Sequence, residues 1–264
     1  MTLVEKAGAA ILEVYDTDFS VEIKDDDSPL TKADLASHRI IVEGLSLLTP
    51  DIPIISEESS LPSFKIRSVW DRYWLIDPLD GTKEFVSRNG EFTVNIALID
   101  KSTPIIGVVG VPTRETVYTG NTETGVATRL SADGVRQIKA RKWDEKNKLE
   151  VVASRHHGAA RLEDFLTLLA EKFGELKIRP VGSSLKLCVI AEGNADIYPR
   201  LGPTSEWDIA AAHAILKAAG GDLQTISGSD FLYNKQNILN PEFVAVADSN
   251  LAWKDAIPKE LFSD

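Results

Sequence analysis

Apolar side chains recur every three or four residues in two segments near the start of the chain. Residues 3–15 have this spacing, which predicts an amphipathic helix. A second helix is expected to begin at Thr31 and to end at Thr49-Pro50. Its apolar positions, spaced by four and three residues, are Ile41, Leu45 and Leu48. The acidic segment at residues 25–29, between the two helices, is expected to be exposed.

The middle of the chain changes to a pattern of short apolar runs, in part alternating at every second residue. Such runs, separated by clusters of turn residues, predict strands. The predicted strands are residues 52–55, 73–76, 92–98, 104–111, 116–119 and 135–140. Their short spacing is typical of an antiparallel meander, so the two N-terminal helices are expected to pack on one large sheet.

Beyond the polar residues 141–148, predicted strands and helices alternate, which indicates an α/β layer. The strands are residues 149–153, 176–181, 195–198 and 243–247 and one around Leu223; the helices carry Leu162 to Leu169, 184–191 and 208–219. We therefore expect an α+β or α/β protein, a layered αβαβα sandwich. Residues 1–145 would form an α+β domain with most candidate metal ligands, and residues 146–264 a smaller α/β domain.

The composition is ordinary for a globular protein, with 43% hydrophobic and 26% charged residues among 264. No apolar run approaches the roughly 18 residues that span a bilayer, and the first residues lack a signal-peptide pattern. The single cysteine, Cys188, excludes an internal disulfide and fits a reducing compartment. We therefore expect a cytoplasmic protein, while its oligomeric state and any contact with a membrane surface stay open.

The charge balance limits the class of partner. The chain has 29 Lys and Arg residues against 40 Asp and Glu residues, a formal net charge of −11. Such a balance argues against binding of a nucleic acid polymer. A small anionic substrate remains compatible with it, provided that cations or a local basic patch receive the anion.

The stretch from Trp74 to Phe85 has the strongest chemical pattern in the chain. Asp77-Pro78 is expected to end the strand before it, because proline fixes φ and has no N–H to donate. Asp77 and Asp80 then flank a tight turn that closes on Gly81-Thr82. Carboxylate and carbonyl oxygens are the ligands that Mg²⁺ prefers, and exposed backbone N–H groups suit a phosphate. The alternative is a surface turn, which Asp-Pro and Asp-Gly also favour.

Other candidate acids have a structural interpretation that each pattern, taken alone, favours. The pairs Thr31/Asp34 and Ser205/Asp208 both have the spacing of a helix capping box. The adjacent acids Glu57-Glu58 follow a predicted strand and are more typical of a solvated loop than of a functional site. These acids acquire a chemical role only if the fold brings them to Asp77 and Asp80.

A candidate anion site lies in the second half of the chain. Residues 182–186, Gly-Ser-Ser-Leu-Lys, join a predicted strand to a predicted helix. Amides, hydroxyls and a lysine in this position can bind a phosphate. Arg200, after Tyr198-Pro199, is uninformative by itself.

Together these stretches resemble the inositol monophosphatase superfamily of Mg²⁺-dependent, lithium-sensitive phosphatases. The resemblance rests on Asp77-Pro78-Leu79-Asp80-Gly81-Thr82, with Glu57-Glu58 before it and Trp207-Asp208, Ala210-Ala211 and Gly220-Gly221 after it. Three further stretches resemble the bacterial 3′(2′),5′-bisphosphate nucleotidases: residues 28–34, residues 88–95, and residues 182–186 continuing to 198–200. The similarity extends from about residue 2 to about residue 248.

This resemblance implies a set of metal ligands. Glu57, Asp77 and the carbonyl of Leu79 would hold a first Mg²⁺, and Asp77, Asp80 and Asp208 a second. Asp77 would bridge the two ions, and a weaker third ion beside Glu57 is left open. The grouping is physically reasonable, because two like charges roughly 4 Å apart repel by about 4 kcal/mol at an effective dielectric near 20, so converging carboxylates need cations.

The resemblance also implies how a substrate is held. Asp34 and Thr82 would orient and deprotonate the attacking water, and the amides of Gly81 and Thr82 would bind phosphoryl oxygens. A second phosphate would be bound in the second half of the chain, where an arginine fork fits a phosphate. The residues expected to contact substrate are Glu57, Leu79, Asp80, Gly81, Thr82, Ser183, Ser184, Lys186, Arg200 and Asp208.

The expected activity is hydrolysis of the 3′-phosphate of adenosine 3′,5′-bisphosphate to AMP and phosphate, which would clear a by-product of sulfate assimilation. Activity on the phosphosulfate analogue stays open. One alternative is an inositol monophosphatase-type sugar or polyol phosphatase with the same site and a different pocket. Another is a metal- or anion-binding regulator without catalysis. A haloacid-dehalogenase-type phosphatase is disfavoured, because its two acids are separated by one residue whereas Asp77 and Asp80 are separated by two.

Overall fold

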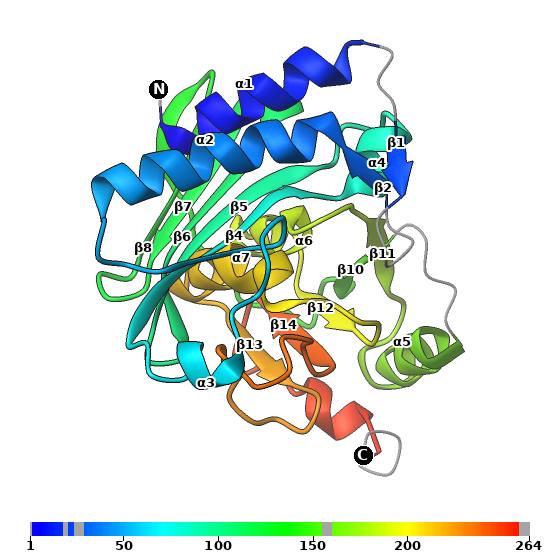
Figure 1. The fold of residues 1–264 in the computed structure, drawn as a ribbon. Helices are drawn as coiled ribbons and strands as arrows, with labels where there is room; N and C mark the ends of the chain where they lie inside the picture. Colours follow the sequence, from blue (N-terminus) through cyan, green and yellow to red (C-terminus); the bar gives the residue numbers. More distant parts are fainter. Residues whose placement is uncertain (1, 18–20, 24–28, 155–159, 259–264) are drawn as a thin grey trace.

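Five layers of helices and sheets make up the fold, in the order helices, sheet, helices, sheet, helix (Figure 1). The structure, a computed structural model, describes residues 2–17, 21–23, 29–154 and 160–258. The layers confirm the αβαβα sandwich that the periodicities predict. The acidic segment that we expect to be exposed lies, at residues 25–28, outside the described residues.

The first layer consists of α1 (Leu3–Tyr15) and α2 (Lys32–Leu48), which lie side by side on one face of the large sheet (Figure 1). Thr2 and Glu5 cap α1 reciprocally, so two of its orphan N–H groups are satisfied. Both helices are confirmed, and α2 begins one residue after the predicted start. Their buried contacts with the sheet come from Val4, Ala7, Ile11, Ala33, Ile41 and Leu45.

The large sheet has seven strands in sequence order, β3 to β9. Only β3 and β4 pair in parallel; every later pair is antiparallel, as a meander requires. The strands are β3 (Ile54–Ser56), β4 (Arg72–Asp80), β5 (Thr93–Asp100), β6 (Thr103–Val111), β7 (Thr116–Asn121), β8 (Val126–Ser131) and β9 (Gly134–Gln137). The sequence pattern does not predict β8, and it places β9 too late, because neither strand has a continuous buried face.

The third layer is formed by α6 (Leu185–Ala191) and α7 (Glu206–Ala218), which lie between the two sheets (Figure 1). Helix α7 packs very closely on the large sheet. A Cβ atom at Gly107 would lie 2.0 Å from the carbonyl oxygen of Ala211, and one at Gly120 would lie 2.5 Å from Cα of Ile215. The absence of a side chain at these two strand positions therefore lets the helix backbone approach, which places the first turn of α7 beside the end of β4.

The second sheet has five strands in the order β11-β10-β12-β14-β13. The strands are β10 (Glu150–Ala153), β11 (Lys177–Pro180), β12 (Ile197–Arg200), β13 (Asp222–Thr225) and β14 (Phe243–Val246). Their side chains alternate between two clusters: Phe243 and Ala245 contact the layer of α7, whereas Val244 and Val246 contact the layer of α5 (Ala160–Phe173). These elements confirm the predicted α/β layer.

One hydrophobic cluster includes residues of both halves of the chain, from Ile55 on β3 to Ala247 after β14. Separate domains at residues 1–145 and 146–264 therefore stay a prediction. The remaining short elements are β1 (Val21–Ile23), β2 (Pro29–Thr31), α3 (Phe64–Arg67), α4 (Thr82–Val86), η1 (Pro112–Arg114) and η2 (Trp253–Ala256). Among the described residues, no helix is both long and apolar enough to cross a membrane.

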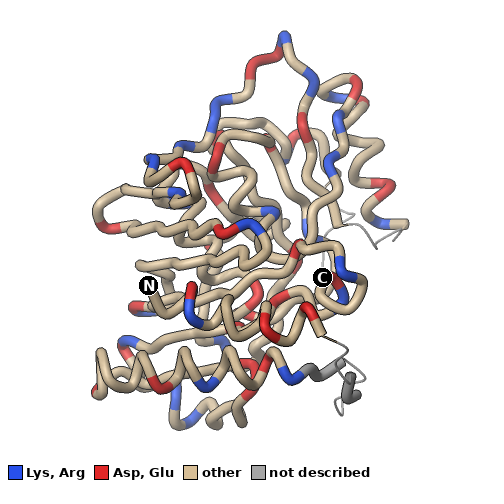
Figure 2. The backbone as a smooth tube through the Cα atoms, turned by 90° about the horizontal axis from the view of Figure 1, so that it is seen from above, with Lys and Arg blue, Asp and Glu red and all other residues tan. Residues whose placement is uncertain are grey.

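Lys and Arg positions are interspersed with Asp and Glu positions along the described chain (Figure 2). Ion pairs such as Arg141 with Asp196 and Arg161 with Glu242 compensate many of these charges locally. That the protein does not bind a nucleic acid polymer stays a prediction from its net charge.

Candidate functional site

Strand β4 presents both Asp77 and Asp80 on the same face of the large sheet. In the pairing with β5, Asp77 is opposite Asn95 and Asp80 is opposite Thr93, so three steps along β4 match two steps along β5. A β-bulge of this kind inserts one extra residue. The prediction that the strand ends at Asp77-Pro78 is therefore wrong: the missing N–H of Pro78 is accommodated within the bulge, and pairing resumes at Asp80.

The buried neighbours of these acids show why the bulge matters. Leu75 belongs to the cluster between the sheets, whereas Leu79 belongs to the cluster under α1 and α2, although an even spacing should leave both on one face. The bulge reverses the alternation between them. Asp77 and Asp80 are an odd number of residues apart, so without the bulge they would point to opposite faces.

Glu57 is brought to Asp77 by the parallel pairing of β3 with β4. Ser56 is in register with Ile76, and the N–H of Glu57 donates to the carbonyl oxygen of Ile76 at 3.2 Å. The two strands therefore deliver Glu57 and Asp77 side by side. Glu57, half-buried, is not in the solvated loop that its pattern alone favours.

Asp34 reaches the same place from the other side, in the first turn of α2. It is 1% exposed, and the neighbouring Ser37 donates from its hydroxyl to the carbonyl oxygen of Pro78 at 2.7 Å. This hydrogen bond fixes the start of α2 against the bulge in β4. Asp34 is close enough to Asp77 to raise the pKa of that carboxyl.

Asp208 lies in the first turn of α7, where the capping interpretation of its sequence pattern is confirmed. Ser205 and Asp208 form a capping box, in which the N–H of Ser205 donates to Asp208 Oδ2 at 2.9 Å. The cap also fixes the direction of the carboxylate. Because α7 is held against the sheet, Asp208 is near enough to raise the pKa of Asp77 as well.

The pKa values show how strongly these carboxyls repel one another. Burial raises the pKa of Asp77 well above its ordinary value, and four neighbours raise it further: Glu57, Asp80, Asp208 and Asp34. Burial also raises the pKa of Asp208 well above its ordinary value, and that of Asp80 to about 6 although Lys186 opposes the change. Five acids from distant segments are therefore brought together in a region that disfavours their ionised forms.

A divalent cation would relieve this repulsion, and the donors are carboxylate and carbonyl oxygens, which suit a hard ion. The types of donor atom fit a divalent cation, whereas the side chains are not arranged around one point. Within the described ranges, no three Asp, Glu, His or Cys side chains are close enough together to hold a metal ion.

The loop at residues 182–186 lies against the bulge of β4. A Cβ atom at Gly81 would lie 3.2 Å from Cβ of Ser183, and one at Gly182 would lie 2.8 Å from Cγ of Glu84. Gly81 has a φ of 91°, which only glycine adopts readily, and α4 begins at Thr82 directly after it. The predicted substrate residues Gly81, Thr82 and Ser183 are therefore neighbours.

Two cations lie next to these groups. Lys186 is 5% exposed, and its Nζ donates to the carbonyl oxygen of Ser183 at 2.8 Å. Burial lowers the pKa of Lys186 to about 8; Asp80 raises this pKa and Arg200 lowers it further. Arg200 donates to the carbonyl oxygens of Gly202 and Pro203, so its guanidinium is held in place by its own loop. An anion beside Lys186 and Arg200 would offset their mutual repulsion.

Several polar residues of the site escape sequence reasoning. Thr93 and Asn95 lie on β5 opposite the two aspartates, and Glu91 accepts from the N–H of Gly182 at 2.7 Å. Thr93 and Asn95 could have been noticed in the sequence, because they are polar residues two positions apart in an otherwise apolar run. Their register with Asp77 and Asp80 is not visible in the sequence.

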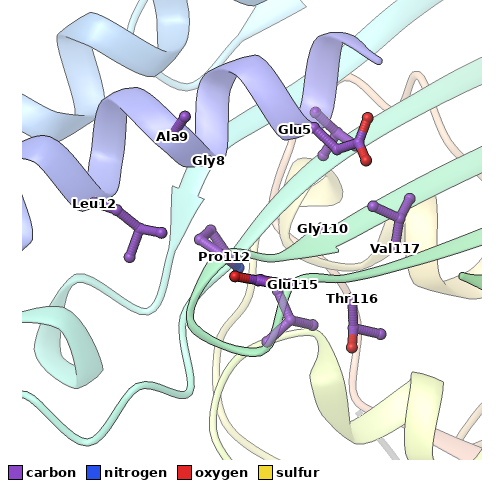
Figure 3. A pocket seen from close by; sticks show the side chains of 11 residues that line it. Glu5, Gly8, Ala9, Leu12, Gly110, Pro112, Glu115, Thr116 and Val117 are labelled. Carbon is purple, nitrogen blue, oxygen red and sulfur yellow. The ribbon is translucent and has the colours of Figure 1, made fainter. Parts of the chain in front are cut away.

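An apolar groove lies elsewhere. It has a volume of about 320 Å³ and runs between α1 and the turn that joins β6 to β7, lined by residues such as Leu12 and Pro112 (Figure 3). None of the predicted site residues lines it. A small cavity of about 30 Å³ beside Arg200 is lined in part by Leu162 and Tyr198. The chemistry of the residues, and not the size of a cavity, therefore locates the site.

Comparisons with known proteins agree with the fold. The curated 3′(2′),5′-bisphosphate nucleotidase CysQ of Salmonella typhimurium is 48% identical over 244 residues, 91% of this chain and 95% of that protein. The protein of the same name from Escherichia coli K12 is 46% identical over the same shares. The crystal structure of CysQ from Bacteroides thetaiotaomicron has a TM-score of 0.83 at 37% identity and covers 94% of this chain and 95% of that one. Residues 1–255 match the model of the inositol monophosphatase family. The chain belongs to the inositol monophosphatase family.

Proposed function

We propose that this protein is an Mg²⁺-dependent phosphatase that hydrolyses the 3′-phosphate of adenosine 3′,5′-bisphosphate to AMP and phosphate. The observation that carries the proposal is the buried lysine of α6, with Arg200 beside it, next to the acids of β4. The acids would bind the metal ions that act on the cleaved phosphate, and the two cations would bind a second phosphate of the same molecule. The names and identities of the curated relatives support this choice of substrate.

In this proposal the chain supplies five metal-binding positions, with Asp77 shared between two ions. When bound, the ions would stabilise charge on the phosphoryl oxygens and lower the pKa of the attacking water. The positions are Glu57, Asp77, the carbonyl of Leu79, Asp80 and Asp208. Since Asp208 Oδ2 already accepts from Ser205, its other oxygen would be the one that faces an ion.

Thr82 would orient the attacking water through its hydroxyl, and the Asp34 carboxylate would accept the proton that the water loses. Asp34 is buried beside Asp77, which keeps its carboxylate close to the reacting phosphate. Thr82 opens α4, so its hydroxyl and the amides of Gly81 and Thr82 lie at the same turn. These amides would bind phosphoryl oxygens while water attacks phosphorus directly, without a phosphorylated enzyme.

The second phosphate would bind between Lys186 and Arg200, with Ser183 at its edge. Arg200 is held by two carbonyl oxygens, so little of its side-chain entropy remains to be lost on binding. Lys186 is buried and close to Asp80, so both phosphates of one small molecule would lie within reach of the same cluster. Ser184 is 3% exposed, and its hydroxyl already bonds to Asn95.

A panel of substrates tests the proposal against the inositol monophosphatase alternative. Phosphate release is measured with adenosine 3′,5′-bisphosphate, inositol 1-phosphate and fructose 1,6-bisphosphate, each with Mg²⁺ and with a chelator. We expect the highest kcat/KM for the bisphosphate nucleotide and no release under chelation. Preference for inositol phosphate would overturn the substrate assignment, and release that is independent of Mg²⁺ would overturn the metal assignment.

A further inference from the structure

Ser184 precedes α6 and joins three elements that meet at the acids. It is 3% exposed, and its N–H donates to Asp80 Oδ2 at 2.5 Å. Its hydroxyl donates to Asn95 Oδ1 at 2.7 Å and lies 2.8 Å from Thr93 Oγ1. Because a hydroxyl has one hydrogen, Thr93 is the donor to Ser184 in this arrangement, and its 3.5 Å approach to Asp80 Oδ2 is the weaker contact. One buried serine therefore ties α6 to β4 and β5.

Asn95 has a donor that the surrounding protein does not use. The side chain is 1% exposed, and among the described residues its carboxamide nitrogen has no hydrogen-bond partner. Leaving a buried donor unsatisfied costs about 1–3 kcal/mol, so a ligand or neighbour is expected to accept from it. Asn95 is directly opposite Asp77, and side chains of such pairs share a face with Cβ atoms about 4.5–5.5 Å apart. The Asp77 carboxylate is therefore the cross-strand acceptor on that face, although no hydrogen bond joins the two groups among the described residues.

We propose that Asn95 and Ser184 are positioning residues of the metal site, and that Asn95 donates to the Asp77 carboxylate while it accepts from Ser184. The inference rests on the proposed function, because it concerns the same acids. The hydroxyl of Ser184 orients Asn95, which in turn orients Asp77 through its carboxamide, and the backbone N–H of Ser184 donates to Asp80. The two metal-binding carboxylates are thus held by one hydrogen-bonded chain.

This arrangement also connects the two halves of the site. Ser184 belongs to the loop that carries Lys186 and Ser183, and Gly182 of that loop is held by Glu91. The loop proposed to bind the second phosphate is therefore fastened to the metal-binding acids by the same serine. Hydrogen-bond partners of metal ligands lower the cost of ordering them, and their loss weakens metal affinity by about 10- to 100-fold.

The test measures metal binding without substrate. Mn²⁺ binding to the full chain is followed by calorimetry for the wild type, Ser184→Ala, Asn95→Leu and the double variant. We expect each single change to raise the Kd for Mn²⁺ by about 10- to 100-fold. The double variant is expected to lose less than the sum of the two losses, because both residues act in one network. High Mn²⁺ should restore kcat, which a purely structural defect would not allow.

Thr119→Val is the matched control, since it removes a hydroxyl that bonds to Thr128 in the same sheet, away from the acids. Its Kd for Mn²⁺ should equal that of the wild type. If Asn95→Leu folds poorly, as its melting temperature would show, Ser184→Ala alone decides the question. Wild-type affinity in Ser184→Ala would overturn the inference and leave the proposed function intact. A wild-type protein that binds no Mn²⁺ would overturn both.

Discussion

The acidic and the cationic sides of the candidate site differ in origin and in purpose. The acids come from several elements, four of them in the first half of the chain and Asp208 on α7. The cations Lys186 and Arg200 both come from the second half, at the start of α6 and the end of β12. In the proposed function, the acids act on whichever phosphate is cleaved, whereas the cations select which molecule brings it.

On each side, burial disfavours the charged form of the side chains: it raises the pKa of the acids and lowers that of the lysine. Burial and like charges raise the pKa of Asp77, and burial lowers the pKa of Lys186 to about 8. A bound cation would stabilise the ionised acids, and a bound anion would stabilise the protonated lysine. In the proposed function, a metal cation completes the acidic side and the second phosphate completes the cationic side, so the two shifts have one common explanation.

The largest effect is expected on the acidic side, from Asp208→Asn. An asparagine at this third position of the capping box can still accept from the N–H of Ser205 through its side-chain oxygen. The fold should therefore stay cooperative, while loss of a metal ligand lowers kcat by about 10²- to 10⁴-fold, equivalent to several kcal/mol. Steady-state kinetics and thermal unfolding check this. Asp164→Asn, an exposed position on α5, is the control; equal activity of both variants would remove Asp208 from the site.

The next effect separates the two sides by substrate. Lys186→Met and Arg200→Ala should each lower kcat/KM for adenosine 3′,5′-bisphosphate by about 10- to 100-fold, the value of a charge-assisted phosphate contact. The same variants should hardly affect 3′-AMP, which lacks the 5′-phosphate. Lys217→Met, at an exposed position of α7, makes the same substitution away from the site. Equal losses on both substrates would mean that the cations support the fold or the acids.

The smallest effect is a pH dependence of stability on the cationic side, in the protein without metal or substrate. The pKa of Lys186 is about 8 in the folded protein against 10.5 in the unfolded chain. Between these values the unfolded chain binds more protons, so stability rises with pH. From pH 7 to 9 the gain should be about 1 kcal/mol.

Urea unfolding at the two pH values measures this gain, and Lys186→Met is the reference because it cannot titrate there. The wild type should gain more stability than the variant over this range. An identical pH dependence in both proteins would show that Lys186 does not carry a lowered pKa. Only the acids would then have a shifted pKa.

Periodicity and local motifs are properties of neighbouring residues, and these the sequence determines by itself. The apolar spacing predicts α1, α2, α7 and most strands of the large sheet, because burial of one face imposes the periods of a helix or a strand. The stretch from Asp77 to Thr82 identifies the chemistry, since these residue types suit a hard cation and a phosphate. The family and its candidate residues follow from the same stretches.

Only the tertiary structure decides which of these groups meet. The β-bulge puts Asp77 and Asp80 on one face, although the sequence pattern predicts that the strand ends there. The pairing of β4 with β5 places Asn95 opposite Asp77, and Ser184 reaches Asp80 from 104 residues away. The physical reason is that strand register and helix packing depend on burial summed over the whole core, whereas local spacing reports only the face on which each residue lies.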